Sequence, residues 1–180
     1  MSIGGPPPGD RPASHALTHL DEHGRARMVD VTGKAETLRR AMARCVIIAT
    51  PDAIEAGAKA EDLFSFAKAS GIHAAKQASS LIPLCHPIPL DDVDVQIAPR
   101  AASIEVRATT SVVSRTGVEI EALAACAAAA LTIVMSLLPG DPDACFTTLA
   151  LWHKSGGRSG TWQRGEGRSI GASEGVDRHA

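Results

Sequence analysis

One long segment of the chain is almost free of charge and consists largely of alanine. It runs from Val118 to Leu138, carries no charged residue beyond Glu119 and Glu121, and is followed by the sequence Pro139-Gly-Asp-Pro142. Alanine has the highest helix propensity, and prolines are common just past a helix end. A helix with so little polar surface must be buried on nearly all sides. We therefore expect it at the centre of the monomer or against a second subunit.

The same segment approaches the length of a membrane span, which is about 20 residues. Alanine contributes little to membrane insertion, and the flanks hold acidic residues but no basic anchors. The segments on both sides also have the alternation of strands in a soluble domain. The sequence therefore predicts burial within a protein and no membrane partner.

The remaining elements follow from hydrophobic periodicity. Apolar residues at three- and four-residue spacing predict a helix over 62–81. Alternation of apolar and polar residues predicts strands at 27–32, 93–97, 104–112 and 145–152, the second and third forming an antiparallel hairpin. The stretch 37–48 fits both a helix and a strand, and its period of two favours the strand.

Composition narrows the functional class. The 180 residues suffice for one domain, and a net charge of −2 with 3% aromatic residues disfavours nucleic-acid binding. The four cysteines are far apart in apolar surroundings, which is typical of buried free thiols in a reducing compartment. The first residues are rich in glycine and proline and lack the apolar run of a secretory signal. We therefore expect a cytoplasmic protein.

Both ends of the chain lack large apolar residues. Such segments cannot offset the entropy cost of ordering. The sequence predicts a disordered tail over 1–16, a folded domain over 17–163 and a second disordered tail over 164–180.

The run Leu81-Ile-Pro-Leu-Cys-His-Pro-Ile-Pro-Leu90 places His86 between prolines at the end of a predicted helix. Proline fixes its own φ and restricts the residue before it, so the imidazole lies on a stiff loop, which suits catalysis. The alternative is that His86 only hydrogen-bonds a backbone carbonyl in an apolar loop. A zinc site is not expected, because adjacent Cys85 and His86 on one rigid loop rarely reach one metal and no second cluster exists.

Two further groups are candidates for ligand binding. The segment Lys154-Ser-Gly-Gly-Arg-Ser-Gly160 combines two cations with glycines whose N–H groups can approach an anion, although a surface turn has the same pattern. Glu119 and Glu121 open the alanine-rich helix, where the helix dipole favours carboxylates. Either could also hold a guanine-like edge or orient a base.

Taken together, these segments resemble the cyclic pyranopterin monophosphate synthase family of molybdenum-cofactor biosynthesis. The resemblance covers roughly 17–163 and rests on ordered motifs: Met28-Val-Asp-Val-Thr32, Ser70-Gly-Ile-His-Ala-Ala-Lys76, Pro83-Leu-Cys-His-Pro87, Thr116-Gly-Val-Glu-Ile-Glu-Ala-Leu123 and Lys154-Ser-Gly-Gly-Arg-Ser-Gly160. Two of these motifs, at residues 83–87 and 116–123, are highly specific to the family.

The resemblance implies an α+β ferredoxin-like fold with an antiparallel sheet packed against helices. It also implies a homohexamer built as a trimer of dimers, with active sites at the dimer interface. The implied reaction converts a cyclised dihydro-GTP intermediate, or a related purine nucleotide, into a cyclic monophosphate plus pyrophosphate, with no cofactor. The positions that match substrate contacts of the family are Leu84, Cys85, His86, Glu119, Ile120, Glu121, Lys154 and Arg158.

Three positions depart from the family pattern. The family has a catalytic lysine, an aspartate and a second lysine where this chain has Ala60, Met135 and Leu138. Lys59 lies one residue before Ala60 and is the candidate replacement for the first lysine, which makes His86 and Lys59 the expected catalytic residues. Loss of a positioned acid or base costs roughly a hundred- to ten-thousand-fold in rate. An impaired nucleotide-binding or scaffold subunit and a different purine-nucleotide enzyme therefore remain alternatives to an active synthase.

Overall fold

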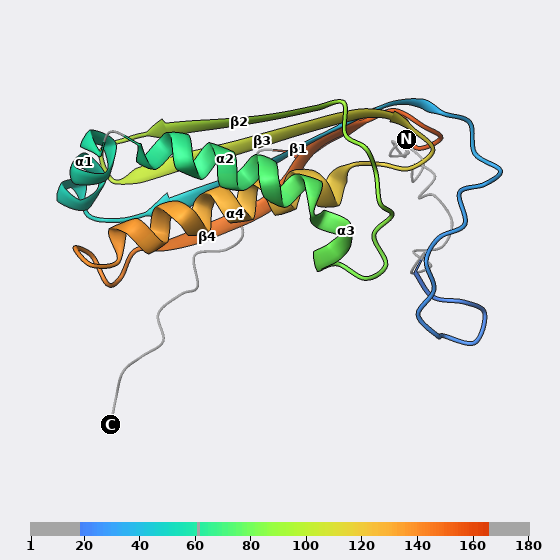
Figure 1. Ribbon diagram of the computed structural model, residues 1–180, viewed down its shortest axis with the longest axis horizontal. Helices are drawn as coiled ribbons and strands as arrows, with labels where there is room; N and C mark the ends of the chain where they lie inside the picture. Colours follow the sequence, from blue (N-terminus) through green and yellow to red (C-terminus); the bar gives the residue numbers. More distant parts are fainter. Residues whose placement is uncertain (1–18, 61, 166–180) are drawn as a thin grey trace, which may run out of the picture.

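The structure of the protein is a computed structural model that describes residues 19–60 and 62–165. Five strands form one antiparallel sheet in the order β2-β3-β1-β4-β5. The strands are β1 (Thr37–Ile48), β2 (Asp92–Pro99), β3 (Ser103–Ser114), β4 (Cys145–Ser155) and β5 (Trp162–Gln163), and the helices are α1 (Pro51–Lys59), α2 (Leu63–Lys76), α3 (Ala78–Leu81) and α4 (Glu119–Leu137). Helices α2 and α4 lie along one face of the sheet (Figure 1). This split βαβ arrangement confirms the expected α+β ferredoxin-like fold.

The alanine-rich helix α4 is the centre of the core, as the sequence predicts. Ala122, Ala125, Ala129 and Ala130 are fully buried between the sheet and α2. A Cβ atom at Gly71 of α2 would lie 2.8 Å from the carbonyl oxygen of Ala125, so the two helix backbones approach too closely for any side chain there. Small residues thus set the separation of the two helices.

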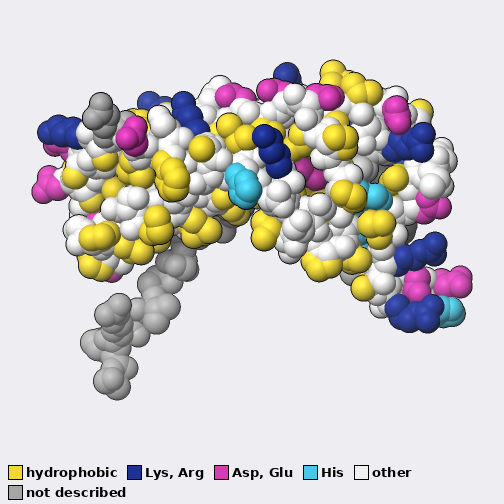
Figure 2. Space-filling model, viewed as in Figure 1, with side chains coloured by type: hydrophobic (Ala, Val, Ile, Leu, Met, Phe, Trp, Pro, Cys, Tyr) yellow, Lys and Arg dark blue, Asp and Glu magenta, His cyan; other side chains and the backbone are white. Residues whose placement is uncertain are grey.

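The expectation that α4 is buried on nearly all sides is wrong for its last two turns. Leu131 is 54% exposed and Met135 is 62% exposed. They lie on one face of the helix, whereas Ile133 and Leu137 in the same two turns are buried against the core. Together with Phe66 and Leu138, the two exposed side chains form an exposed apolar surface, the apolar end, which is seen on the left of Figure 2.

Strand β1 confirms the strand interpretation of 37–48. Ala41, Ala43, Cys45 and Ile47 alternate with more exposed residues and are fully buried towards the helices. The predicted hairpin is also present, because β2 and β3 pair from Asp92 opposite Ser111 to Pro99 opposite Ile104. The period of two was therefore the correct signal for the sheet.

The predicted strand over 27–32 is wrong. Only the isolated bridge between Leu20 and Ala26 pairs in this region. Asp30 accepts hydrogen bonds from the backbone N–H and the hydroxyl of Thr32 (2.9 and 2.8 Å), and this local turn replaces sheet pairing.

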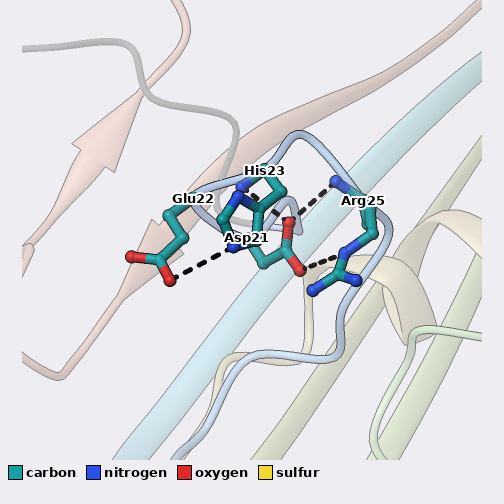
Figure 3. A network of polar contacts seen from close by, with 4 residues as sticks. All are labelled: Asp21, Glu22, His23 and Arg25. Atoms are coloured by element: carbon teal, nitrogen blue, oxygen red, sulfur yellow. Dashed lines mark hydrogen bonds and ion pairs between the residues drawn. The ribbon is translucent and has the colours of Figure 1, made fainter.

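A second aspartate shapes the loop just before that segment. Asp21 accepts hydrogen bonds from the backbone N–H groups of His23 and Arg25, both at 2.9 Å, and pairs with the Arg25 guanidinium (Figure 3). The Arg25 backbone bond is the main reason that the pKa of Asp21 lies below its ordinary value. The backbone N–H of Arg27 then donates to the carbonyl of His19, which ties the start of the described chain to the loop.

Two helical segments differ from expectation. The helix predicted over 62–81 is interrupted at Gln77, whose φ of −102° and ψ of 7° depart from helical values, so that it forms α2 and α3. Helix α1 was not predicted, although Thr50, Pro51 and Asp52 are the usual residues of a helix start. Its start is held by Asp141, whose carboxylate accepts from the backbone N–H of Thr50 at 2.7 Å.

The cysteines are free, but their burial differs from the expected pattern. Cys45 and Cys126 are buried, Cys85 is half-buried and Cys145 is exposed. The predicted tail 1–16 lies outside the described residues, as does the tail 164–180 except for its first two residues. Of these, Arg164 donates hydrogen bonds to the carbonyl oxygens of Leu151 and Trp152, both at 2.9 Å.

One helix in the described part of the chain, α4, has the length and composition of a membrane span, and half of that stretch is buried inside the fold. The core helix of a globular domain has the same properties. Contacts of α4 with α2 and with four strands of the sheet are those of a core helix.

The close helix approach at Gly71 yields a stability prediction. Replacing Gly71 with Val places a branched side chain against the Ala125 carbonyl and the side chains of Val95 and Ala129, and overpacking of this kind costs roughly 1–3 kcal/mol. We expect urea unfolding to show a loss in that range. Ala69→Val on the exposed side of α2 is the control and should cost less than about 1 kcal/mol. Equal losses for the two variants would refute the packing argument.

Candidate functional site

The stiff loop after α3 places His86 at one end of the sheet, opposite α1 (Figure 1). The backbone N–H of Cys85 donates to the carbonyl of Ile82 at 2.9 Å, which closes a turn around Pro83. His86 follows this turn, is half-buried and faces a cavity. The loop thus brings His86 to the wall of a cavity, and a catalytic role for this side chain stays a prediction.

The start of α4 brings two carboxyl groups to the same place. The Thr110 hydroxyl of β3 donates to the carbonyl of Val118 at 2.9 Å and fixes the helix start inside the core. Glu119 and Glu121 then occupy the first turn. The Glu119 carboxylate folds back over Gly117, where a Cβ atom would lie within 3 Å of it, so a side chain at residue 117 would displace the carboxylate.

Strand β4 supplies the opposite wall. Lys154 lies opposite Ala41 of β1 in the sheet register, and its Nζ atom is 3.1 Å from Oε1 of Glu119. Both side chains are about one-third exposed. This ion pair joins α4 to β4 and separates two adjoining cavities.

The inner cavity lies on the α4 side of the ion pair and has a volume of about 320 Å³. Its lining includes His19, Leu84, Cys85, His86, Glu119, Ile120, Glu121 and Lys154. Acids, an imidazole, a thiol and an ammonium group therefore line one cavity.

Two further cavities are lined by cations. The first, the middle cavity, has a volume of about 350 Å³ and shares His86, Glu119 and Lys154 with the inner one. It continues into an outer cavity of about 610 Å³. The cations that line these two cavities are Lys34, Arg39, Arg40, Arg115, Lys154 and Arg158. Such a wall suits a ligand with several negative charges.

Two glycines shape the cationic wall. Gly156 and Gly157 have φ values of 97° and 69°, which favour glycine. A Cβ atom at Gly157 would collide with the Arg39 guanidinium, and Arg39 in turn donates to the carbonyls of Ser114 and Arg115 at 3.4 Å. The loop after β4 therefore packs directly on a cation of β1.

The most buried polar contact of the site joins Cys85 to Glu121. The thiol donates to Oε1 of Glu121 at 3.3 Å. Burial, followed by the neighbouring carboxyl, raises the pKa of Cys85 to about 12, so it remains a protonated donor. Burial is also the main cause that raises the pKa of Glu121, which is 3% exposed.

The residues singled out from the sequence mostly converge. Six of them (Leu84, Cys85, His86, Ile120, Glu121 and Lys154) line the inner cavity with Glu119, and Arg158 lines the outer one. Lys59 does not join them within one chain. It lies at the end of α1, is 74% exposed and pairs with Glu55 at 2.5 Å.

Three cations of the site were missed as individual residues: Lys34, Arg39 and Arg40. Arg39 and Arg40 enter the middle cavity because β1 pairs with β3 and β4 in a particular register, and Lys34 lies in the loop just before β1. The only sequence signal was a cluster of basic residues at the start of a strand. Among residues 19–60 and 62–165, no cluster of three or more His, Cys, Asp or Glu side chains is placed to hold a metal ion.

The fold and the cavity define an α+β protein with acid and base groups beside a cationic wall. The chain belongs to the MoaC family, whose model matches residues 28–157. It is 47% identical over 154 residues to the cyclic pyranopterin monophosphate synthase of Thermomicrobium roseum, covering 82% of this chain and 93% of that protein. It is 49% identical over 154 residues to the synthase of Novosphingobium aromaticivorans, covering 83% of this chain and 98% of that protein. Synthase 1 of Mycobacterium tuberculosis is 47% identical over 154 residues, covering 83% of this chain and 91% of that protein.

The raised pKa of Cys85 yields a labelling prediction. The thiolate is the reactive form, so at pH 8 iodoacetamide should label Cys85 on the order of a hundredfold more slowly than an ordinary exposed thiol. The exposed Cys145 is the internal reference, and Cys85→Ser identifies the slow peptide by mass spectrometry. Equal labelling rates for Cys85 and Cys145 would show that the Cys85 thiol is not shielded in this way.

Proposed function

We propose that this chain is a cyclic pyranopterin monophosphate synthase of molybdenum-cofactor biosynthesis. It converts a cyclised dihydro-GTP intermediate into the cyclic monophosphate and releases pyrophosphate. The observation that carries the proposal is the inner cavity, where His86, Glu121 and the Lys154–Glu119 pair meet in a member of this family.

The chemistry of the cavity suits this reaction. Opening and closing of rings requires groups that donate and accept protons, and such groups have to lie within hydrogen-bond reach of the reacting atoms. The inner cavity supplies an imidazole, His86, and two carboxyl groups in different surroundings, one paired with a cation and the other buried without one. Different surroundings let two carboxyl groups take different roles.

The cations of the middle and outer cavities suit the phosphates. Lys34, Arg39 and Arg158 form a wall that continues from the inner cavity past Lys154. Preorganised cations stabilise the charge that develops on a leaving pyrophosphate. We therefore assign the purine-derived ring to the inner cavity and the phosphates to the cationic wall.

Lys59 belongs to this proposal as a residue of a second copy. Within one chain it lies at the opposite end of the sheet from His86 (Figure 1). The family resemblance implies active sites at a dimer interface and a homohexamer built as a trimer of dimers. In such an assembly, Lys59 is an exposed cation that a neighbouring copy can present to the cavity. A homohexamer in the cytoplasm is the state we propose, in keeping with four free cysteines.

A turnover assay tests the proposed function. Purified protein is supplied with the cyclised dihydro-GTP intermediate, and mass detection follows the cyclic monophosphate and pyrophosphate. His86→Ala removes a group that can transfer protons and should lower kcat roughly a hundred- to ten-thousand-fold. His73→Ala, on the exposed side of α2, is the matched control and should behave as wild type.

The assay has two unfavourable outcomes. Turnover that is unaffected by His86→Ala would remove His86 from the mechanism. Nucleotide binding without any turnover by the wild-type protein would instead support the alternative, a nucleotide-binding or scaffold subunit. The first residues to examine for the cause would then be Ala60, Met135 and Leu138, which stand where the family has a lysine, an aspartate and a second lysine.

The cationic wall yields a binding prediction. A hydrogen bond to a charged group contributes about 1.5–3 kcal/mol, so Arg158→Gln should weaken binding of the triphosphate substrate roughly ten- to a hundredfold. Isothermal titration calorimetry measures the affinity. Arg100→Gln, in the turn between β2 and β3 at the other end of the sheet, removes the same charge and is expected to leave the affinity unchanged. Equal effects of the two substitutions would contradict a phosphate site at Arg158.

A further inference from the structure

We propose that Cys85 is a positioning residue: its thiol fixes Oε1 of Glu121, and the free Oε2 atom carries the proton of a neutral carboxylic acid that donates to the ligand in the inner cavity. The inference deepens the proposed function and depends on it only for its kinetic test. It assigns different roles to two carboxyl groups that lie two residues apart on the same helix turn.

The first step is the unpartnered oxygen. Glu121 lines the inner cavity and is 3% exposed, yet Oε2 has no hydrogen-bond partner among the described residues. A buried carboxylate oxygen without a partner is costly, whereas a protonated oxygen needs only an acceptor, which a ligand in the inner cavity can supply. The structure thus leaves one buried oxygen of a cavity-lining residue without a partner among the described residues.

The second step is the contrast between the two carboxyl groups. Glu119 has a cation within reach, Lys154 at 3.1 Å, and about one-third of it is exposed to solvent. Among the side chains that the structure describes, the hydrogen-bond donor to Glu121 is the uncharged Cys85 thiol at 3.3 Å. A carboxyl group that is buried with a neutral donor favours the acid form, and one that is paired with an ammonium group favours the carboxylate.

The third step is the set of charged groups around Glu121. The inner cavity also contains His19 from the N-terminal loop, His86 from the loop after α3, and Lys154 from β4. Burial raises the pKa of Glu121 most strongly and Glu119 raises it further. A hydrogen bond from its own backbone N–H lowers this pKa most, followed by the Cys85 hydrogen bond and then His86. The thiol is therefore the side-chain donor that lowers the pKa of an acid that burial alone would keep protonated to a higher pH.

The role of Cys85 follows from proton balance. When Oε2 releases its proton, the O–H bond breaks and a new O–H or N–H bond forms on the ligand. The negative charge that remains on the Glu121 carboxylate is stabilised by the S–H donor of Cys85. The high pKa of Cys85, about 12, ensures that the thiol itself does not lose its proton first.

A titration of the substrate-free protein tests the inference. Glutamate carboxyl carbons are labelled with carbon-13, and their NMR signals are followed against pH. One signal should titrate above the ordinary range of glutamate and disappear in Glu121→Gln. Cys85→Ala removes a donor to the carboxylate and should move this midpoint up by roughly half to one pH unit, while Cys85→Ser supplies a stronger donor and should move it down. Cys145→Ser, an exposed thiol outside the cavity, should leave it in place.

Kinetic measurements distinguish a positioning role of Cys85 from a purely structural one. Glu121→Gln keeps the size of the side chain and a neutral N–H donor but has no transferable proton, so KM should change less than about threefold while kcat falls at least a hundredfold. The alkaline limb of the kcat profile should shift with the Cys85 substitutions in the same directions as the NMR midpoint. If the midpoint does not move in either Cys85 variant, the inference is overturned. It is also overturned if the wild-type protein shows no raised glutamate signal. A raised signal with the expected shifts but no turnover supports it and rejects the proposed function instead.

Discussion

The close approach of α4 to α2 and to the sheet is the constraint on which the rest of the molecule depends. Alanine and Gly71 leave no room between the helix backbones, so α4 has little freedom to slide or rotate. Because the Thr110 hydroxyl also holds the carbonyl of Val118, the start of α4 is fixed relative to β3. The positions of Glu119 and Glu121 are therefore a result of core packing. An active-site wall that is set by the core needs no mobile segment to form.

Three elements that are distant in sequence meet at this wall. The proline-rich loop contributes Cys85 and His86, α4 contributes the two glutamates, and β4 contributes Lys154. The polarity of the site therefore changes from one side to the other. A buried thiol–carboxyl contact lies on one side and exposed cations lie on the other. A ligand with a nearly neutral ring and a highly charged tail matches that gradient.

Local signals in the sequence were sufficient for much of the fold and for several of the residues that line the cavities. The alanine-rich segment indicated the core helix, and alternation indicated β1 and the β2–β3 hairpin. Arg27–Thr32 had the same alternation, but the turn at Asp30 satisfied its backbone locally, and no pattern of side chains reports that competition. Arg39 and Arg40 joined the site through strand register, which depends on pairing between distant segments. The contact between Cys85 and Glu121 likewise required the three-dimensional arrangement, since 36 positions separate the two residues.

The two ends of the sheet have opposite characters. One end holds the cavities, and the other holds the exposed apolar residues Phe66, Met135 and Leu138. Helix α4 connects them over 19 residues, which is about 28 Å at 1.5 Å per residue. Energetic effects of substitutions at such a distance usually add without interaction. Within one copy, residues 135 and 138 are therefore too far from the cavity to act on it, so changes there can reach the site only in an assembly that brings the apolar end of a second copy to the cavity end of the first.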